Sequence, residues 1–342
     1  MRNNKRVLIT GIITLLIVAL LGAYRMPYYI YKPGSADELD PIVQVADGFQ
    51  SEGEMHLVTV RGGQATPIQW LLASIRPYHQ IYPLDQIRPE GVSEEEYYHA
   101  QLRLMESSQE AAKVVAYQAA DKDIEINYEG VYVVNVLEGM PAEKALKSGD
   151  EITKVDDQQV KETNDLIDYV SDMEEGDTVT LTIEREDETL QKEIALAPFP
   201  DNPDKVGVGI SLVTDRTVEV NPEVTVKSGE IGGPSAGLMF TLEMYDQLTE
   251  EDITRGYQVA GTGEINYEGE VGRIGGIDKK VVAASDDGVN IFFAPNEEGR
   301  EGSNYEVAKQ TAEDIGTDMK VVPVDTFDDA LNYLKQLEPR TS

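Results

Sequence analysis

The chain of 342 residues contains no cysteine, a single tryptophan and only three histidines. Without cysteine it has neither disulfide bonds nor a thiolate nucleophile. The three histidines all lie in the first third of the sequence, at His56, His79 and His99. A hydrolytic site in the C-terminal half therefore has no local histidine to act as its base.

Basic residues are also scarce, with 29 Lys and Arg against 63 Asp and Glu and a net charge of −34. Phosphate backbones are bound by basic patches, so this balance argues against nucleic acid as a partner. The acidic excess is typical of a solvated, self-repelling surface. The dipeptide Gly-Lys does not occur, which removes the phosphate-binding loop of ATP-driven machines. We expect no ATP, no metal and no other cofactor.

Long apolar runs are absent except for Val7–Tyr24, which is uncharged over 18 residues. Its length predicts a transmembrane anchor at residues 7–24. Three basic residues precede it, which predicts a cytoplasmic segment at residues 1–6 and extracellular domains after the anchor. A cleaved signal peptide is the alternative, but Leu21-Gly22-Ala23 has leucine where cleavage needs a small residue. The predicted location is thus the cell membrane, with a single pass.

Residues 25–119 form the predicted N-terminal extracellular region. Alternation predicts a strand over residues 55–61. Thr66 followed by Pro67 predicts a capped helix over residues 66–75. Ser93 and Glu96 have the spacing of a capping box, which predicts that a longer helix over residues 93–120 begins there.

Residues 120–200 change to short strands and turns. The run GVYVVNVLEGMPAEKALKSGDEITKVDDQQV resembles a PDZ domain of the kind found in proteases. The resemblance implies that an extended peptide binds by strand addition, with amides at Gly130 and Val131 receiving a carboxylate. Capture of an internal segment, or control of access, stays open. The proline-rich stretch 198–203 predicts a linker to the final domain.

Ser235 lies in the motif Gly-Gly-Pro-Ser-Ala-Gly, followed by a predicted helix over residues 236–247. Gly232 and Gly233 allow torsions closed to other residues, and Pro234 suits the first turn of a helix. Backbone amides at a helix N-terminus lack helical partners and can hold an oxyanion. We therefore expect Ser235 to be a nucleophile and Gly233 to contact the substrate; a simple helix cap is the alternative.

Lys280 is the candidate base. It lies on a predicted helix over residues 277–286, about 60° around the helix axis from Ile277. Lys279 lies about 160° away from the same residue, which predicts the solvent side. Removal of Lys280 from water would lower its pKa, and a neutral amine beside a hydroxyl can act as a general base. The alternative is a surface lysine with a partly covered stem.

Thr262 lies between these two motifs, in a predicted strand and hairpin with the sequence Gly-Thr-Gly-Glu-Ile. Its hydroxyl is placed to hydrogen-bond the lysine amine, although a threonine is also common in any strand.

The ordered set GGPSAG, GTGEI and GGIDKKVVAA resembles the proteolytic domain of Lon-type serine proteases, over residues 206–337. The resemblance implies a catalytic Ser-Lys dyad of Ser235 and Lys280, with Thr262 as the support of the lysine. Asp278 replaces the first lysine of the family motif, outside the dyad. Lon-type domains are ring formers, which leaves a homo-oligomer open.

An anchor, a PDZ-like domain and a Lon-like domain together resemble the membrane-anchored PDZ–Lon proteases of Gram-positive bacteria, some of which process pheromones. The expected fold class is α+β multidomain: an N-terminal transmembrane helix, a β-rich PDZ-like domain and a Lon-type α+β proteolytic domain. The expected function is ATP-independent serine endopeptidase activity on extracellular peptides or unfolded protein segments. The alternative is a non-catalytic scaffold that binds peptides through the PDZ-like domain.

Overall fold

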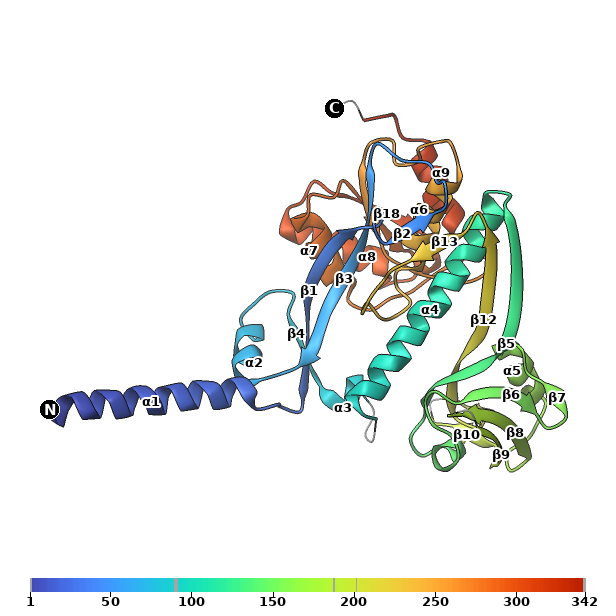
Figure 1. The fold of residues 1–342 in the computed structure, drawn as a ribbon, viewed down its shortest axis with the longest axis horizontal. Coiled ribbons are helices and arrows are strands. Elements are labelled where there is room, and N and C mark those ends of the chain that lie inside the picture. Colours follow the sequence, from blue (N-terminus) through green and yellow to red (C-terminus); the bar gives the residue numbers. More distant parts are fainter. Residues whose placement is uncertain (1, 89–91, 187, 201, 341–342) are drawn as a thin grey trace.

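The computed structural model describes residues 2–88, 92–186, 188–200 and 202–340. Met1, the first residue of the predicted cytoplasmic segment, lies outside them. The chain begins with α1 (Arg2–Ala23), a helix that extends away from the rest of the molecule (Figure 1). Across the described part of the chain, no helix combines the length and apolar character that a membrane span requires.

The main body is built on a six-stranded sheet with the order β18-β17-β14-β3-β1-β4. Strands β18, β17, β14 and β3 run parallel to one another, whereas β1 is antiparallel to both β3 and β4. The strands are β1 (Tyr28–Glu38), β3 (Glu54–Gln64), β4 (Gln80–Pro83), β14 (Gln258–Gly261), β17 (Ile291–Pro295) and β18 (Lys320–Val324).

This sheet joins two regions that are far apart in the sequence. Strand β3 comes from the predicted N-terminal region and pairs with β14 of the predicted proteolytic domain, with Met55 opposite Val259. The two regions therefore share one sheet and one core.

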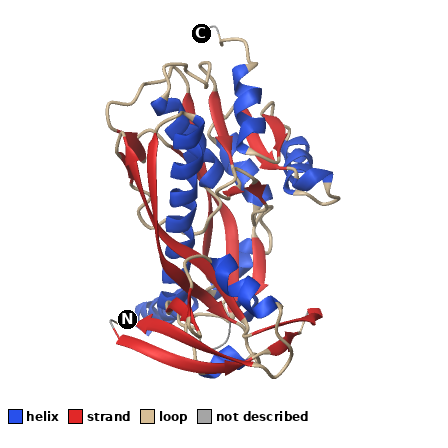
Figure 2. Ribbon diagram, turned by 90° about the vertical axis from the view of Figure 1, so that its right-hand side faces the viewer, coloured by secondary structure: helices blue, strands red, loops and turns tan. Residues whose placement is uncertain are grey.

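Helices cover both faces of the sheet, and side chains alternate between them as the strand period of two requires. One face packs against α4 (Glu94–Ala119), α6 (Gly237–Leu248) and α9 (Phe327–Lys335), and it receives Val259 and Phe293. The other packs against α7 (Ile277–Asp286) and α8 (Asn304–Ile315), and it receives Ala260 and Phe292. Figure 2 shows α4 running alongside the long strands.

Both predicted helix starts in the N-terminal region are confirmed. The Ser93 hydroxyl accepts from the amide of Glu96, whose carboxylate accepts from the amide of Ser93, and α4 begins at the next residue. Thr66 and Gln69 make the same reciprocal pair at the start of α2 (Pro67–Ala73).

A second sheet, with the order β12-β5-β6-β8-β9, forms the smaller domain around its own core. Strands β5 and β12 pair antiparallel over their length and also lead into the main body (Figure 1). The bounds are β5 (Asp123–Val136), β6 (Glu151–Val155), β8 (Thr178–Arg185), β9 (Glu188–Ala195), β12 (Ile210–Asn221) and α5 (Thr163–Ser171).

The stretch 198–203, predicted to be a linker, contains paired strands in its described part. Strands β10 (Ala197–Phe199) and β11 (Asn202–Gly207) pair antiparallel there. Backbone pairing overrode the proline-rich composition on which the prediction rested. The remaining elements are β2 (Val43–Val45), α3 (Leu84–Ile87), η1 (Pro141–Lys144), β7 (Gln158–Gln159), β13 (Val224–Val226), β15 (Glu264–Ile265), β16 (Val271–Gly272) and η2 (Glu297–Gly299).

Candidate functional site

Ser235 lies at the N-terminal end of α6, one residue before its N-cap Ala236. The loop before it turns at Gly233, whose φ of +88° favours glycine. Helix α4 holds this loop in two places: the amide of Gly233 donates to the carbonyl of Gln101 at 2.8 Å, and the hydroxyl of Ser108 donates to the carbonyl of Pro234 at 2.8 Å. The predicted position of Ser235 at a helix entrance is confirmed.

Lys280 reaches Ser235 from α7. Its Nζ lies 2.6 Å from the Ser235 Oγ and 2.9 Å from the Oγ1 of Thr262. The residue is only 4% exposed, and burial lowers the pKa of its amine from 10.5 to about 7. Desolvation produces this shift because it disfavours the charged form. The predicted inward position of Lys280 is thus confirmed.

Thr262 fixes the direction of the lysine amine. Its Oγ1 donates to the Ser235 carbonyl at 2.9 Å, so a lone pair of Oγ1 is left to accept from Nζ. In neutral Lys280, one N–H then points to Thr262, and the nitrogen lone pair can face the Ser235 hydroxyl. Thr262 is fully buried, and its amide donates to the Phe293 carbonyl at 3.1 Å, so its position is set by the sheet.

Two backbone donors lie beside the Ser235 hydroxyl. Within the described residues, the amides of Ser235 and Ala236 have no hydrogen-bond acceptor. Gly233 is predicted to contact substrate, but its amide already donates to the Gln101 carbonyl. Gly233 still lines the cleft described next, but the amides suited to an oxyanion are those of Ser235 and Ala236.

Ser235 and Lys280 open into a cleft of about 1190 Å³. One wall of this cleft is β3 from Leu57 to Gln64. Strand β14 ends opposite Leu57, so beyond this residue β3 pairs only with β1 among the described strands. The remaining edge of β3 carries backbone donors and acceptors that an extended chain can pair with.

The predicted solvent side of α7 is wrong. Lys279 is 1% exposed, and its Nζ contacts both carboxylate oxygens of Asp278, at 3.0 and 3.1 Å. The helix packs on β1 and β3, with Gly276 against Val60 at its start. The helical wheel predicts one buried face for α7, but β1 and β3 also cover the face that carries Lys279.

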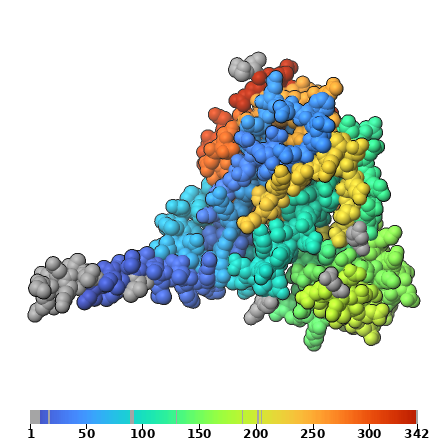
Figure 3. All heavy atoms as spheres, viewed as in Figure 1, coloured from blue at the N-terminus to red at the C-terminus, as the bar shows by residue number. Residues whose placement is uncertain are grey.

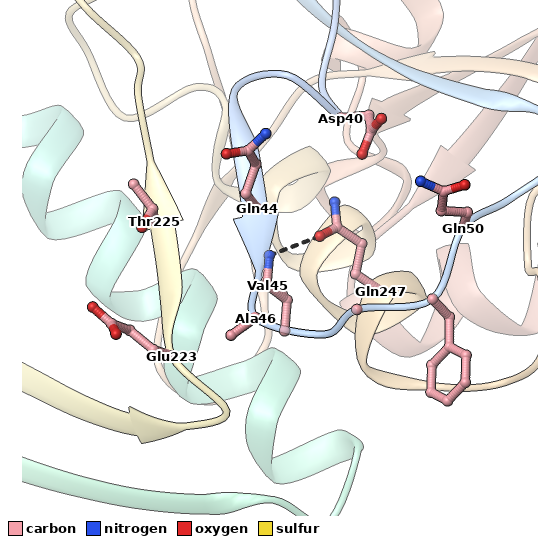
Figure 4. Close-up of a pocket in the computed structure, with 10 residues that line it drawn as sticks. Asp40, Gln44, Val45, Ala46, Gln50, Glu223, Thr225 and Gln247 are labelled. Atoms are coloured by element: carbon pink, nitrogen blue, oxygen red, sulfur yellow. Dashed lines mark hydrogen bonds between the residues drawn. The ribbon is translucent and has the colours of Figure 1, made fainter.

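A smaller cavity of about 470 Å³ lies between β2, β13 and the end of α6 (Figure 4). The Gln247 side chain crosses it to accept from the amide of Val45 at 2.8 Å. Its lining includes Asp40 and Glu223 but no hydroxyl paired with a base. The pairing of a hydroxyl with an amine that Ser235 and Lys280 form belongs to the larger cleft.

The structure places Gly130 and Val131 differently from the prediction. Both lie within β5, where Val131 is opposite Thr214 of β12 and Ile152 of β6. Val131 is fully buried. Because strands flank it on both sides, this part of the backbone forms no exposed carboxylate-binding loop.

The turn before β12 has the geometry expected of such a loop. The carbonyls of Val208 and Gly209 accept from the amides of Ala142 and Leu137, both at 2.9 Å. The carbonyl of one residue and the amide of the next point in opposite directions across a trans peptide. The amides of Gly209 and Ile210 therefore point away from that wall.

Strand β12 also lies at the edge of its sheet and contacts α5. Gly209 has a φ of +89°, and a Cβ there would collide with Met140. The signal available in the sequence was the Gly207-Val208-Gly209 pattern just before a strand. The prediction placed the loop near the start of the domain, whereas this glycine pattern comes just before the domain's last strand.

Comparisons with known proteins match two parts of the chain. The family model of the PDZ domain matches residues 105–196, and that of the Lon protease (S16) C-terminal proteolytic domain matches residues 205–336. The Lon protease of Metamycoplasma arthritidis is 30% identical over 142 residues, covering 41% of this chain and 16% of that protein. The Lon protease of Malacoplasma penetrans is 36% identical over 118 residues, covering 34% and 14%. The chain thus spans less than a fifth of these relatives' length.

Among solved structures, the PDZ domain of the SdrC-like protein from Listeria monocytogenes is 36% identical. The alignment covers 26% of this chain and 93% of that one, with a TM-score of 0.24. The corresponding domain from Listeria innocua is 33% identical over 25% of this chain and 93% of that one, with a TM-score of 0.23.

Proposed function

Because this chain joins a PDZ domain to a Lon-type (S16) proteolytic domain, as PDZ–Lon proteases do, we propose that it is an ATP-independent serine endopeptidase with a Ser-Lys dyad. The observation that carries the proposal is the 2.6 Å contact between the buried Lys280 amine and the Ser235 hydroxyl. A neutral amine at this distance is placed to remove the hydroxyl proton.

In the proposed reaction, neutral Lys280 takes the proton of Ser235 as Oγ attacks the peptide carbonyl. The amides of Ser235 and Ala236 hold the resulting oxyanion. Its collapse breaks the C–N bond, and the Lys280 ammonium protonates the leaving amine. Water then attacks the acyl-enzyme, again giving its proton to Lys280, and the second collapse returns that proton to Ser235 Oγ. Thr262 keeps the amine directed at Ser235 throughout.

The substrates in this proposal are peptides and unfolded segments that bind extended. The edge of β3 beyond Leu57 lines the same cleft as Ser235, and strand addition along it would bring a peptide carbonyl towards the nucleophile. A folded protein has its backbone groups already paired and fits this mode poorly.

The PDZ domain would present the substrate. Its edge strand β12 and the amides of Gly209 and Ile210 supply a place for a peptide end. Strand β12 continues to Asn221, and the chain then reaches Ser235 through β13. A peptide held on β12 is therefore linked to the catalytic loop by a short stretch of chain.

We also propose that α1 anchors the protein and that the two domains work at the outer face of the cell membrane. The apolar run from Val7 to Tyr24 and the basic residues before it support this orientation. Short secreted peptides, including signalling peptides of the pheromone kind, fit the location and the open cleft. Assembly into a homo-oligomer is part of the same proposal.

The test is peptide cleavage by the full chain in detergent. We expect wild type to cut an unstructured fluorogenic peptide, and Ser235→Ala and Lys280→Met to lose the activity. Two matched controls, Ser228→Ala in the same loop and Lys309→Met on the exposed side of α8, keep it. Peptide that binds to wild type without being cut would instead support the non-catalytic scaffold.

A further inference from the structure

Most of the large apolar side chains of helix α2 face solvent and not the protein core. Ile68, Leu71 and Leu72 share one face of this short helix, and Ile75 follows in the turn after its C-cap Ser74. All four are exposed, Leu71 by 61% and Ile75 by 75%. The face turned to the protein instead carries the small Ala73, packed with Ile30.

This apolar stripe has no cover among the described residues. Trp70, the only tryptophan of the chain, lies on the neighbouring side of α2, where its ring centroid is 6.5 Å from that of Tyr28, and it is 36% exposed. Contiguous exposed apolar groups of this kind mark a surface for a partner or a membrane. Tryptophan is enriched where proteins meet the bilayer interface.

Hydrogen bonds hold the segment just before α2 against the residues that follow α1. The amide of Met26, just after α1, donates to the Ala65 carbonyl at 2.8 Å, and the Arg25 guanidinium donates to the Gln64 carbonyl at 2.9 Å. Helix α2 begins only two residues after Ala65. Figures 1 and 3 show α2 beside the base of α1, on the side from which α1 extends.

Four basic residues, Arg25, Lys32, Arg61 and Arg76, line the cleft next to α2, together with the acidic Asp37 and Glu230. Arg25 and Arg76 are exposed at either end of this region, and Lys32 lies directly opposite Arg61 on β1 and β3. Like charges directly opposite across strands are destabilising. No acidic side chain forms an ion pair with these four among the described residues. In a chain of net charge −34, this basic group is suited to an anionic surface.

We propose that α2 lies in the headgroup layer of a lipid bilayer, with its apolar stripe inserted and the surrounding basic residues on anionic lipid. An amphipathic helix with aromatic and basic residues binds membranes in this way. The inference rests on the proposed anchoring by α1, because that anchor brings α2 to the bilayer. Gln69, Leu72 and Arg76 also line the cleft that holds Ser235, so the cleft would open at the membrane surface, towards segments that emerge from it.

The single tryptophan allows a direct test on the full chain. The protein is reconstituted in vesicles of phosphatidylcholine and phosphatidylglycerol that carry bromine on the acyl chains close to the headgroups. We expect Trp70 emission to shift to the blue and to be quenched by the bromine. Ile75→Glu and Leu71→Glu should reduce both effects, whereas Ile167→Glu, at another exposed apolar site on α5, should not.

Flotation with vesicles tests the membrane anchor, and peptide cleavage tests the peptidase activity, so each proposal can be judged separately from the placement of α2. A chain that floats with vesicles but shows unquenched Trp70 overturns the inference and leaves the anchor standing. A chain that does not float overturns both. A blue shift that depends on protein concentration and not on lipid also overturns it, since it would identify a second copy as the cover. Cleavage in detergent reports the peptidase activity independently of all three results.

Discussion

The amine of Lys280 determines the pH at which the proposed reaction runs. Its pKa is lowered to about 7 by burial, and only the neutral form accepts the Ser235 proton. We expect kcat/KM to rise about tenfold per pH unit below that value and to level off above it. Lys280→Arg stays charged and should be inactive throughout.

A series of kcat/KM measurements on an unstructured peptide, from about pH 5 to about pH 9, checks this profile. Lys309→Arg, an exposed lysine on α8, should follow wild type. A rate that is flat across pH 7, or that falls as pH rises, would contradict the role of Lys280 as base.

Thr262 is a positioning residue in this account. Thr262→Val keeps the shape but removes the hydroxyl that accepts from Lys280 and donates to the Ser235 carbonyl. We expect kcat to fall about 10- to 100-fold, which corresponds to the loss of a buried hydrogen bond. KM should stay near the wild-type value.

Thr262→Ser separates this role from a purely structural one, because it restores the hydroxyl but not the methyl group. Recovery of most of kcat by Thr262→Ser supports positioning. Equal losses for the Val and Ser variants would contradict positioning by the hydroxyl alone, because the Ser variant keeps the hydroxyl and lacks only the methyl group.

Sequence patterns predicted the positions of Ser235 and Lys280 separately, and the resemblance to Lon-type proteases paired them. The motif around Ser235 and the helical position of Lys280 each predicted a residue facing the same interior. The position of Lys279 was not predictable in this way. Its burial depends on β1 and β3, which lie more than 200 residues earlier in the chain.

At the scale of elements, the proposed peptide-binding edge of the PDZ domain is β12. We expect a peptide with a free C-terminal carboxylate to shift the amide resonances of Gly209 and Ile210, because these N–H groups point away from the wall that binds their neighbouring carbonyls. The same peptide with a C-terminal amide should shift them less. The measurement is NMR of selectively labelled full-length protein.

Larger shifts at Gly130 and Val131 would instead favour the placement first predicted from the sequence. That placement failed in the structure for a physical reason. The local sequence around Gly130 is compatible with a loop or with a strand. The pairing of β5 with both β6 and β12 determines that a strand forms.

Long-range pairing also explains the part of the fold that local patterns left open. The strand at residues 55–61 was predicted from alternation, and β3 spans it. Its partner β14 lies some 200 residues later. Local sequence patterns do not indicate which distant strand a given strand pairs with. The pairing of β3 with β14 is therefore known only from the structure.

At the scale of the whole molecule, the chain should act without nucleotide. We expect the full chain to cut an unfolded protein such as a reduced, alkylated polypeptide, and to leave a stably folded protein of the same length intact. Addition of ATP with Mg²⁺ should change neither rate, because the sequence has no phosphate-binding loop. Gel electrophoresis of both substrates over time checks this.

Cleavage of the folded substrate at a rate similar to the unfolded one would contradict this prediction. So would stimulation by ATP, which would require a nucleotide site that the sequence does not predict.

The most direct test is to label the chain with a serine-reactive fluorophosphonate and locate the label by mass spectrometry. The account predicts a single modified peptide carrying the label on Ser235, with labelling that increases as pH rises through about 7 and that Lys280→Met abolishes. A label on another serine, or equal labelling of wild type and Lys280→Met, would contradict the Ser235–Lys280 dyad.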